Sequence, residues 1–377
     1  MYFLDNPTQG DQFDQREKRL MIGANASHAT SLQAVGAEHT LTVGVQSRAD
    51  FQSPVGLYRT ERRERLSTVR EDQVSETGTG GYVEAQSRWR PWLRTTLGIR
   101  GDVYTFDVTS DRPENSGRRT AAIASPKASL VFAPTATTEL YLSGGLGFHS
   151  NDARGTTITV DPATGDPAQR VDPLVRSRGA EIGLRANPVP DWRTTLALWA
   201  LNLDSELLFV GDGGTTEPSD RSRRSGVTLA NFYRPVPQLS LDADVSFAHA
   251  RFAGVEPGAD HLPGALENVL AAGATWAPRK TGPFGALRVR HFGSYPLVED
   301  NSVRATATTL VNASAGYQLG GTRVQASMLN LLNARASDIQ YAYASRLPGE
   351  AASGTTDVHF HPVEPRQLRI SLGWGTS

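Results

Sequence analysis

The side chains best suited to chemistry lie near the end of the chain, in the run Asp357-Val-His-Phe-His-Pro-Val. Asp357, His359 and His361 are spaced by two, so an extended segment presents all three on one side. One carboxylate and two imidazoles form a partial site for a transition metal. Ligands along one straight strand converge poorly on a single ion, however, and Pro362 follows directly. We therefore favour a structural role where a loop meets a strand, and predict no metal site.

Two tyrosines precede this run with the same spacing. Tyr341 and Tyr343 would share one face of an extended segment. Packing of their rings would stabilise the surrounding loop.

No pattern typical of an enzyme accompanies these residues. Serine, histidine and aspartate are plentiful, but none has nucleophile-elbow or zincin spacing. The glycine-rich segments 78–81 and 211–214 lack the Lys-Ser or Lys-Thr that ends a phosphate-binding loop, so we expect them to be flexible loop tips. The charges alternate in sign between Arg59 and Arg65, which predicts a solvent-exposed face. The formal net charge of only -1 argues against a nucleic-acid-binding surface. We predict no enzymatic activity, no cofactor and no nucleic-acid partner.

The elements that position these residues are predicted to be strands. The chain of 377 residues is 38% hydrophobic, with mean hydropathy -0.36 and no cysteine. These values suit a soluble protein, but they also suit a transmembrane β-barrel, in which only every second residue meets lipid. No run of about 18 apolar residues is present, which argues against a membrane-spanning helix.

Alternation of apolar and polar residues recurs along the chain. In the closing run 367–374, Leu368, Ile370, Leu372 and Trp374 alternate with polar or small residues. In 239–247 the alternating partners include Asp242 and Asp244. Carboxylates on an inner face are costly in a dry core and tolerated beside water. Glu84, Gln86, Arg88, Arg100 and Asp102 are likewise assigned to the inner face.

Short turns alternate with long polar connections, as in an outer-membrane barrel. Tight turns are predicted near 35–37, 89–92, 133–135, 187–191, 234–238, 278–283 and 319–322. Long loops are predicted near 51–73, 108–118, 150–175, 208–222, 250–265, 296–304 and 337–364. Five of the six tryptophans, at 89, 92, 192, 276 and 374, lie beside the tight turns or the C-terminus. Such a girdle marks a membrane interface, because an indole places its ring in lipid and its N–H in water.

The last seventy or so residues resemble the C-terminal end of the TonB-dependent receptors of Gram-negative outer membranes. The resemblance rests on the segment Asn330-Leu-Leu-Asn333, the Pro365-Arg366 entry and the final amphipathic strand. The segments 178–185 and 203–212 resemble two further strands of that family. One departure is that Trp374, followed by Gly-Thr-Ser, stands where the family ends on phenylalanine.

Counting back from the C-terminus gives about 15 strands, the first near residues 16–32 and the last at 365–375. The resemblance implies an all-β, antiparallel transmembrane β-barrel with about 22 strands expected. We expect residues 1–377 to be the C-terminal portion of such a barrel, without the plug domain, the TonB box or a signal peptide. An odd number of strands could not close by antiparallel pairing.

The function that the resemblance implies is energy-coupled uptake of a scarce, bulky ligand across the outer membrane. A siderophore-iron complex, a corrinoid or an oligosaccharide would qualify as the ligand. Tyr341, Tyr343, Asp357, His359 and His361 would then lie in an extracellular loop as candidate ligand contacts. Implied partners are outer-membrane lipid, the barrel assembly machinery and the TonB system through a plug domain. A porin-like passive channel or a surface adhesin without a plug is the alternative.

Overall fold

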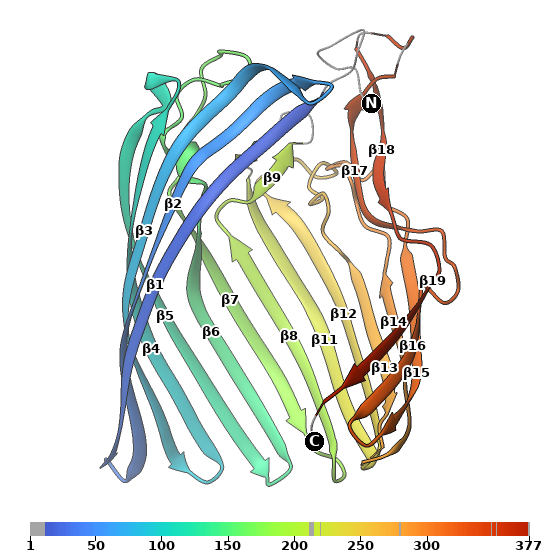
Figure 1. Ribbon diagram of the computed structural model, residues 1–377. Coiled ribbons are helices and arrows are strands. Elements are labelled where there is room, and N and C mark those ends of the chain that lie inside the picture. The colour runs from blue at the N-terminus through green and yellow to red at the C-terminus, as the bar shows by residue number, and fades with distance from the viewer. Residues whose placement is uncertain are drawn as a thin grey trace.

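One antiparallel sheet makes up most of the protein. The computed structural model describes residues 12–210, 215–218, 220–278, 280–347, 349–351 and 353–375. Fifteen strands pair in the order β1-β2-β3-β4-β5-β6-β7-β8-β11-β12-β13-β14-β15-β16-β19 (Figure 1). Among the described residues, no helix is both long enough and apolar enough to cross a membrane.

The strands of this sheet are β1 (Phe13–Ala34), β2 (Ala37–Glu61), β3 (Glu64–Arg90), β4 (Leu93–Ser110), β5 (Gly117–Thr135), β6 (Thr138–Ser150), β7 (Leu174–Ala186), β8 (Trp192–Leu203), β11 (Arg221–Val236), β12 (Leu239–Ala253), β13 (Asn268–Trp276), β14 (Gly282–Phe292), β15 (Thr308–Leu319), β16 (Thr322–Leu329) and β19 (Gln367–Trp374). Two small hairpins stand apart from it: β9 (Leu207–Val210) with β10 (Thr215–Pro218), and β17 (Ser337–Ser345) with β18 (Thr355–Pro362). The helical segments are η1 (Pro113–Asn115) and α1 (Ala153–Thr157).

The sheet curves into an open wall. Its edge strands, β1 and β19, do not pair with each other within the described ranges (Figure 1). Every neighbouring pair is antiparallel, so with 15 strands the two edges run in the same direction. The 15 strands of this sheet and their antiparallel topology are as predicted, and the first and last strands lie within a few residues of the predicted ranges.

The two faces of the sheet differ as the alternation predicts. On β12, Phe247 leaves 53% of its surface exposed on the outer face, and Asp242 on the opposite face pairs with Arg288 of β14 at 2.6 Å. Glu84 pairs with Lys127 at 2.5 Å, again across the inner face. Water beside this face explains why so many charges are retained there.

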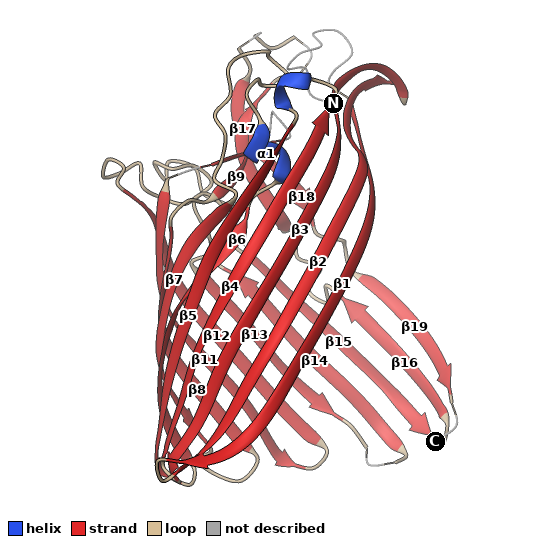
Figure 2. Cartoon of the chain, turned by 90° about the vertical axis from the view of Figure 1, so that its left-hand side faces the viewer, coloured by secondary structure: helices blue, strands red, loops and turns tan. Residues whose placement is uncertain are grey.

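The two ends of the sheet also differ (Figure 2). At one end, the turn end, strands join through connections such as 35–36, 91–92 and 320–321. At the other, the loop end, most connections are long, and one of them carries α1. Trp92, Trp192, Trp276 and Trp374 all lie at the turn end, as the sequence predicts, while Trp199 lies within β8.

The predicted loop at 51–73 is wrong. β2 continues to Glu61 and β3 begins at Glu64, which leaves Arg62 and Arg63 as the turn. These strands have 25 and 27 residues, whereas about 9–11 suffice to cross a bilayer. Where both faces of a hairpin meet water, strand pairing continues without an alternating pattern.

The glycines of 78–81 do not form a loop tip either, because they lie within β3. A Cβ at Gly80 would lie 2.1 Å from Asp102 Oδ1, and one at Gly78 would lie 2.6 Å from Tyr104 Cε1. These glycines leave room for large inward side chains of β4. The other glycine-rich segment, 211–214, lies outside the described residues.

Candidate functional site

The five predicted contact residues lie on one hairpin at the loop end (Figure 1). Tyr341 of β17 is opposite His359 of β18, and Tyr343 is opposite Asp357. His361 pairs one step further along, with Ile339. Because directly opposed residues share a face, the hairpin gathers all five side chains on one side. Tyr341 is 41% exposed on that side.

The two imidazoles are held by different partners. The ring of His359 stacks on that of Tyr343, with centroids 3.8 Å apart and planes 15° apart. Its Nε2 lies 3.1 Å from Ser345 Oγ. His361 instead contacts Asp338 through Nδ1, at 2.8 Å. Asp357, His359 and His361 therefore do not converge on one point, and no group of three metal-ligating side chains occurs in the ranges that the structure describes.

A buried glutamine fixes the hairpin to the rest of the protein. Gln340 is only 6% exposed and points to the face opposite the tyrosines. Its Oε1 accepts hydrogen bonds from Thr306 N at 3.1 Å and from Thr306 Oγ1 at 3.2 Å. Its Nε2 donates to Thr306 O at 3.0 Å. The sequence analysis did not identify Gln340, because only the fold brings residue 306 beside it.

The base of the same connection is tied by the asparagine segment used for the family resemblance. Asn330 is 5% exposed and has a positive φ of 46°. Its Nδ2 donates to Ala334 O and to Glu364 O, both at 3.0 Å. Asn333 Oδ1 accepts from Arg366 N at 3.0 Å. These bonds hold the start and the end of the connection together.

A second structured region at the loop end is the connection 151–173, which contains α1. Ala153 packs in a buried cluster with Val74 of β3 and with Phe106 and Val108 of β4. Phe106 is fully buried and lies on the inner face, since it belongs to the same alternating set as Asp102. The connection therefore folds over the inner face near the mouth of the sheet rather than extending into solvent.

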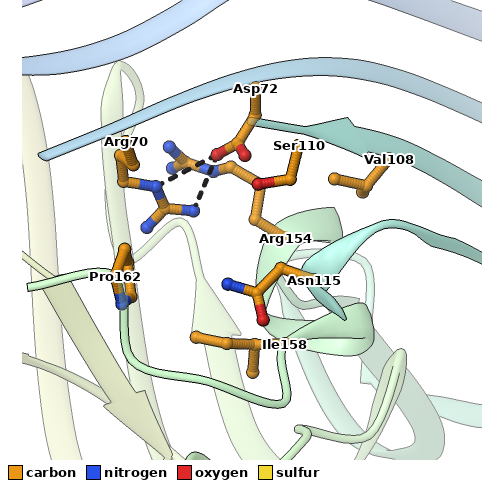
Figure 3. Close-up of a pocket in the computed structure, with 8 residues that line it drawn as sticks. All are labelled: Arg70, Asp72, Val108, Ser110, Asn115, Arg154, Ile158 and Pro162. Atoms are coloured by element: carbon orange, nitrogen blue, oxygen red, sulfur yellow. Dashed lines mark hydrogen bonds and ion pairs between the residues drawn. The ribbon is translucent and has the colours of Figure 1, made fainter. Parts of the chain in front are cut away.

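Polar contacts join this connection to η1, next to the charged inner side chains of β3 (Figure 3). Asn115 Oδ1 accepts from Thr159 N at 2.9 Å and from Val160 N at 3.0 Å. Beside it, Arg70 pairs with the buried Asp72 at 3.0 Å. The hollow between these side chains measures about 10 Å³, room for about one water molecule. It is a packing seam and too small for an organic ligand.

Asp152 and Arg154 set the start of α1. The Asp152 side chain caps the helix by accepting from Arg154 N at 2.9 Å, and its carboxylate pairs with the Arg154 guanidinium at 2.6 Å. Desolvation opposes ionisation of Asp152, but 42% of its side chain stays accessible and the hydrogen bonds from Arg154 prevail. They hold the pKa of Asp152 below its ordinary value.

A larger hollow lies on the inner face, across β4 to β8. It has a volume of about 630 Å³, within the range of about 300–1,000 Å³ common for small-molecule sites. Gly145, Gly147 and Gly179 contribute to its floor, and Lys127, Glu181 and Trp199 supply charge and an aromatic ring. Such a surface offers polar contacts to a passing ligand or to another protein segment, and nothing in it resembles a nucleophile activated by a base.

Comparison with known proteins agrees with this architecture. A family model described as "TonB dependent receptor-like, beta-barrel" matches residues 2–331. The ferric-catecholate import receptor Fiu from E. coli K12 superposes with a TM-score of 0.73 at 14% identity, covering 96% of this chain and 55% of Fiu. The ferric yersiniabactin uptake receptor FyuA from Yersinia pestis gives 0.69 at 14% identity, covering 96% and 55%. The copper transporter OprC gives 0.67 at 14% identity, covering 96% and 57%.

At these identities the likeness to solved structures establishes the fold. The chain spans little more than half the length of the receptors it matches.

Proposed function

Since this chain belongs to the TonB-dependent receptor family, as part of its outer-membrane β-barrel, we propose that it forms the wall of a transporter for energy-coupled uptake. Proteins of this family are transporters of the Gram-negative outer membrane and not enzymes. The cargo that we propose is a scarce, bulky molecule: a siderophore-iron complex, a corrinoid or an oligosaccharide.

The ion-paired inner face is the observation that carries this proposal. Arg288 with Asp242 and Lys127 with Glu84 place opposite charges in contact across the inner face, each pair reaching over one intervening strand. Paired charges give a polar wall with little net field, which suits passage of a large hydrated molecule better than selection of a small ion. The hollow of about 630 Å³ on the same face supports contact with a bulky cargo or with a plug domain.

We propose that the β17–β18 hairpin makes the first contact with the cargo. Tyr341 is 41% exposed, and the stacked Tyr343–His359 pair adds a second flat surface on the same face. Asp357 and His361 supply polar groups beside it. Aromatic rings offer large contact area at a low cost in conformational entropy, which suits capture from dilute solution.

The functional receptor needs components that pair with or fill this wall. In the described part of the chain each of β1 and β19 has a paired strand on one side only, and this supports further strands in the receptor, because open edges cannot remain in hydrocarbon. We propose that a plug domain occupies the inner side of the wall and transmits the pull of TonB. We also propose that the barrel assembly machinery inserts the complete receptor into the outer membrane.

The test is uptake by cells that lack the chromosomal gene and express the complete receptor. A panel of radiolabelled ferric chelates, a corrinoid and an oligosaccharide is supplied with and without a protonophore. We expect one class to enter, and uptake to stop when the proton gradient is dissipated. Uptake that continues at an unchanged rate with the protonophore would establish the passive channel instead.

The hairpin is tested in the same cells by Tyr343→Ala and by His359→Ala. Each should weaken binding of the imported ligand to whole cells by about tenfold, as for a central aromatic contact. Phe360→Ala is the matched control, because Phe360 lies on the opposite face of the hairpin and is 62% exposed. Equal losses in all three variants would assign a folding role to the hairpin.

A further inference from the structure

The outer face of four adjacent strands changes from apolar to positively charged near the loop end. The register of β7, β8, β11 and β12 aligns Ile182, Leu198, Val227 and Phe247 in one apolar row. Two residues nearer the loop end, the aligned row is Ala180, Ala200, Ser225 and His249. Two residues further, it is Arg178, Asn202, Arg223 and Arg251. We call Arg178, Arg223 and Arg251 the arginine row.

The depth of this row follows from strand geometry. Tyr233 lies at the other end of β11 and packs against Trp192, with ring centroids 5.8 Å apart, in the position of an interfacial girdle. Ten residues separate Arg223 from Tyr233. At about 3.3 Å per residue this is about 33 Å along the strand, or about 25 Å along the membrane normal at a tilt of about 40°. That distance equals the height of the apolar band of a barrel, so the arginine row lies at the outer interface.

In the described part of the chain, the carboxylates near the arginine row do not neutralise all three guanidinium charges. Arg223 and Arg251 are directly opposed across β11 and β12, and like charges in this position repel. Arg178 is paired with Asp204 at 2.7 Å, and Arg251 lies 3.9 Å from Asp260. Arg223 is exposed and makes no ion pair within the described part of the chain. A further anion would relieve the repulsion between Arg223 and Arg251.

The surface around Arg223 is hollowed. Asn202, Arg223, Ser225, His249 and Arg251 are among the residues that line a hollow of about 530 Å³. Guanidinium groups bind phosphate oxygens in pairs of parallel hydrogen bonds, and amide and hydroxyl groups beside them add donors. The outward orientation of the hollow directs it towards lipid headgroups and away from the path of the cargo.

We propose that the arginine row binds the phosphate groups of a phosphorylated glycolipid in the outer leaflet. Arg223 and Arg251 hold one phosphate between them, and Asn202 and Ser225 contact the same headgroup. This lipid anchors the β7–β12 part of the wall at a fixed depth, independently of which cargo the receptor carries.

The experiment uses the complete receptor purified from outer membranes in a mild detergent. The receptor is exchanged into nanodiscs of phosphatidylcholine doped with equal amounts of a bis-phosphorylated lipid A and phosphatidylglycerol, and lipids retained after delipidation are counted by native mass spectrometry. Wild type should retain lipid A in preference to phosphatidylglycerol. Arg223→Gln should lower that retention on the order of tenfold, as expected for loss of a charge-assisted bond.

The matched control is Arg63→Gln, which removes the same charge from the turn between β2 and β3. It should retain as much lipid A as wild type, and a heat-modifiable gel shift checks that each variant is folded. Equal retention by wild type and Arg223→Gln would overturn the proposal, as would equal retention of both lipids. Displacement of lipid A by millimolar inorganic phosphate would show that the site binds anions nonspecifically, and this result would also overturn the proposal.

Discussion

The indole of Trp199 on β8 lies directly across Gly226 on β11. The two residues are paired in register, and a Cβ added at Gly226 would lie 2.5 Å from Trp199 Cζ2 and 2.4 Å from the main-chain oxygen of Phe247. The indole Nε1 donates to Thr228 Oγ1 at 3.2 Å, which holds the ring in place. The inward indole of Trp199 therefore fits only because the residue opposite it is glycine, which has no side chain.

Gly226→Ala should destabilise the protein by about 1–3 kcal/mol, the usual cost of overpacking, because the Phe247 oxygen belongs to the backbone and cannot move aside. Urea unfolding in bilayers, followed by tryptophan fluorescence, measures the change. Gly101→Ala is the control: it also lies in a strand, but a Cβ there meets no atom within 4 Å. Equal effects of the two substitutions would contradict the role assigned to Trp199.

An arginine on the outer face of β12 should lower the free energy of unfolding, and the loss should increase with the depth of the residue in the bilayer. Val245→Arg, four residues above the Tyr233 level by pairing with Leu229, should cost about 2–4 kcal/mol near the midplane. Leu241→Arg, which pairs with Tyr233 itself, should cost about 0–1 kcal/mol at the interface. Folding titrations into liposomes measure both.

Asp244→Arg provides the control for that series, because residue 244 is next to Val245 and faces inward. It should have a much smaller effect than Val245→Arg. A cost at residue 244 as large as that at residue 245 would mean that the faces of β12 are assigned wrongly.

Loss of the Asn330 side chain should loosen the β17–β18 connection. Asn330→Ala removes two donated bonds and leaves the Ala334 and Glu364 carbonyl groups without this partner, at a cost of about 1–3 kcal/mol. Hydrogen exchange of the hairpin amides should therefore accelerate. Asn187→Ala, at an exposed turn, should leave exchange in the hairpin unchanged, and acceleration in both variants would point to a general effect on the sheet.

Acid should release the connection 151–173 from the sheet. Desolvation raises the pKa of Asp152, but the hydrogen bonds from Arg154 lower it more, so the folded-state pKa lies below the ordinary value. The stabilisation is therefore present above about pH 3.9 and is lost as the pH falls through the folded-state pKa. Hydrogen exchange of α1 should accelerate below about pH 4.

Asp152→Asn keeps a good helix cap but cannot titrate. In this variant exchange of α1 should already be faster at pH 7, and acidification should change it less than in wild type. An unchanged pH dependence would show that other carboxylates control the release.

The alternating pattern in the sequence was enough to predict the number and antiparallel pairing of the strands in the sheet, and the face of residues in the strands where the alternation is clear. Lipid on one side and water on the other impose a period of two, so Leu368, Ile370 and Asp242 could be placed from the pattern. Most of the long loops could be predicted from polar, turn-forming segments, and the tryptophans at the turn end from the amphipathic character of indole. Where both faces meet water, as in 51–73, the pattern disappears, and the strands there were missed.

The tertiary structure decided which residues meet across strands. Gln340 is anchored by Thr306, Trp199 lies over Gly226, and Arg223 is opposed to Arg251 only because of the register between neighbouring strands. Alternation within one strand gives the face of a residue but not its level on the next strand, and a shift of two residues preserves the face while changing every partner. The amphipathic pattern of the sequence thus determined the two faces of the sheet, and the register between strands determined which residues meet to form sites on those faces.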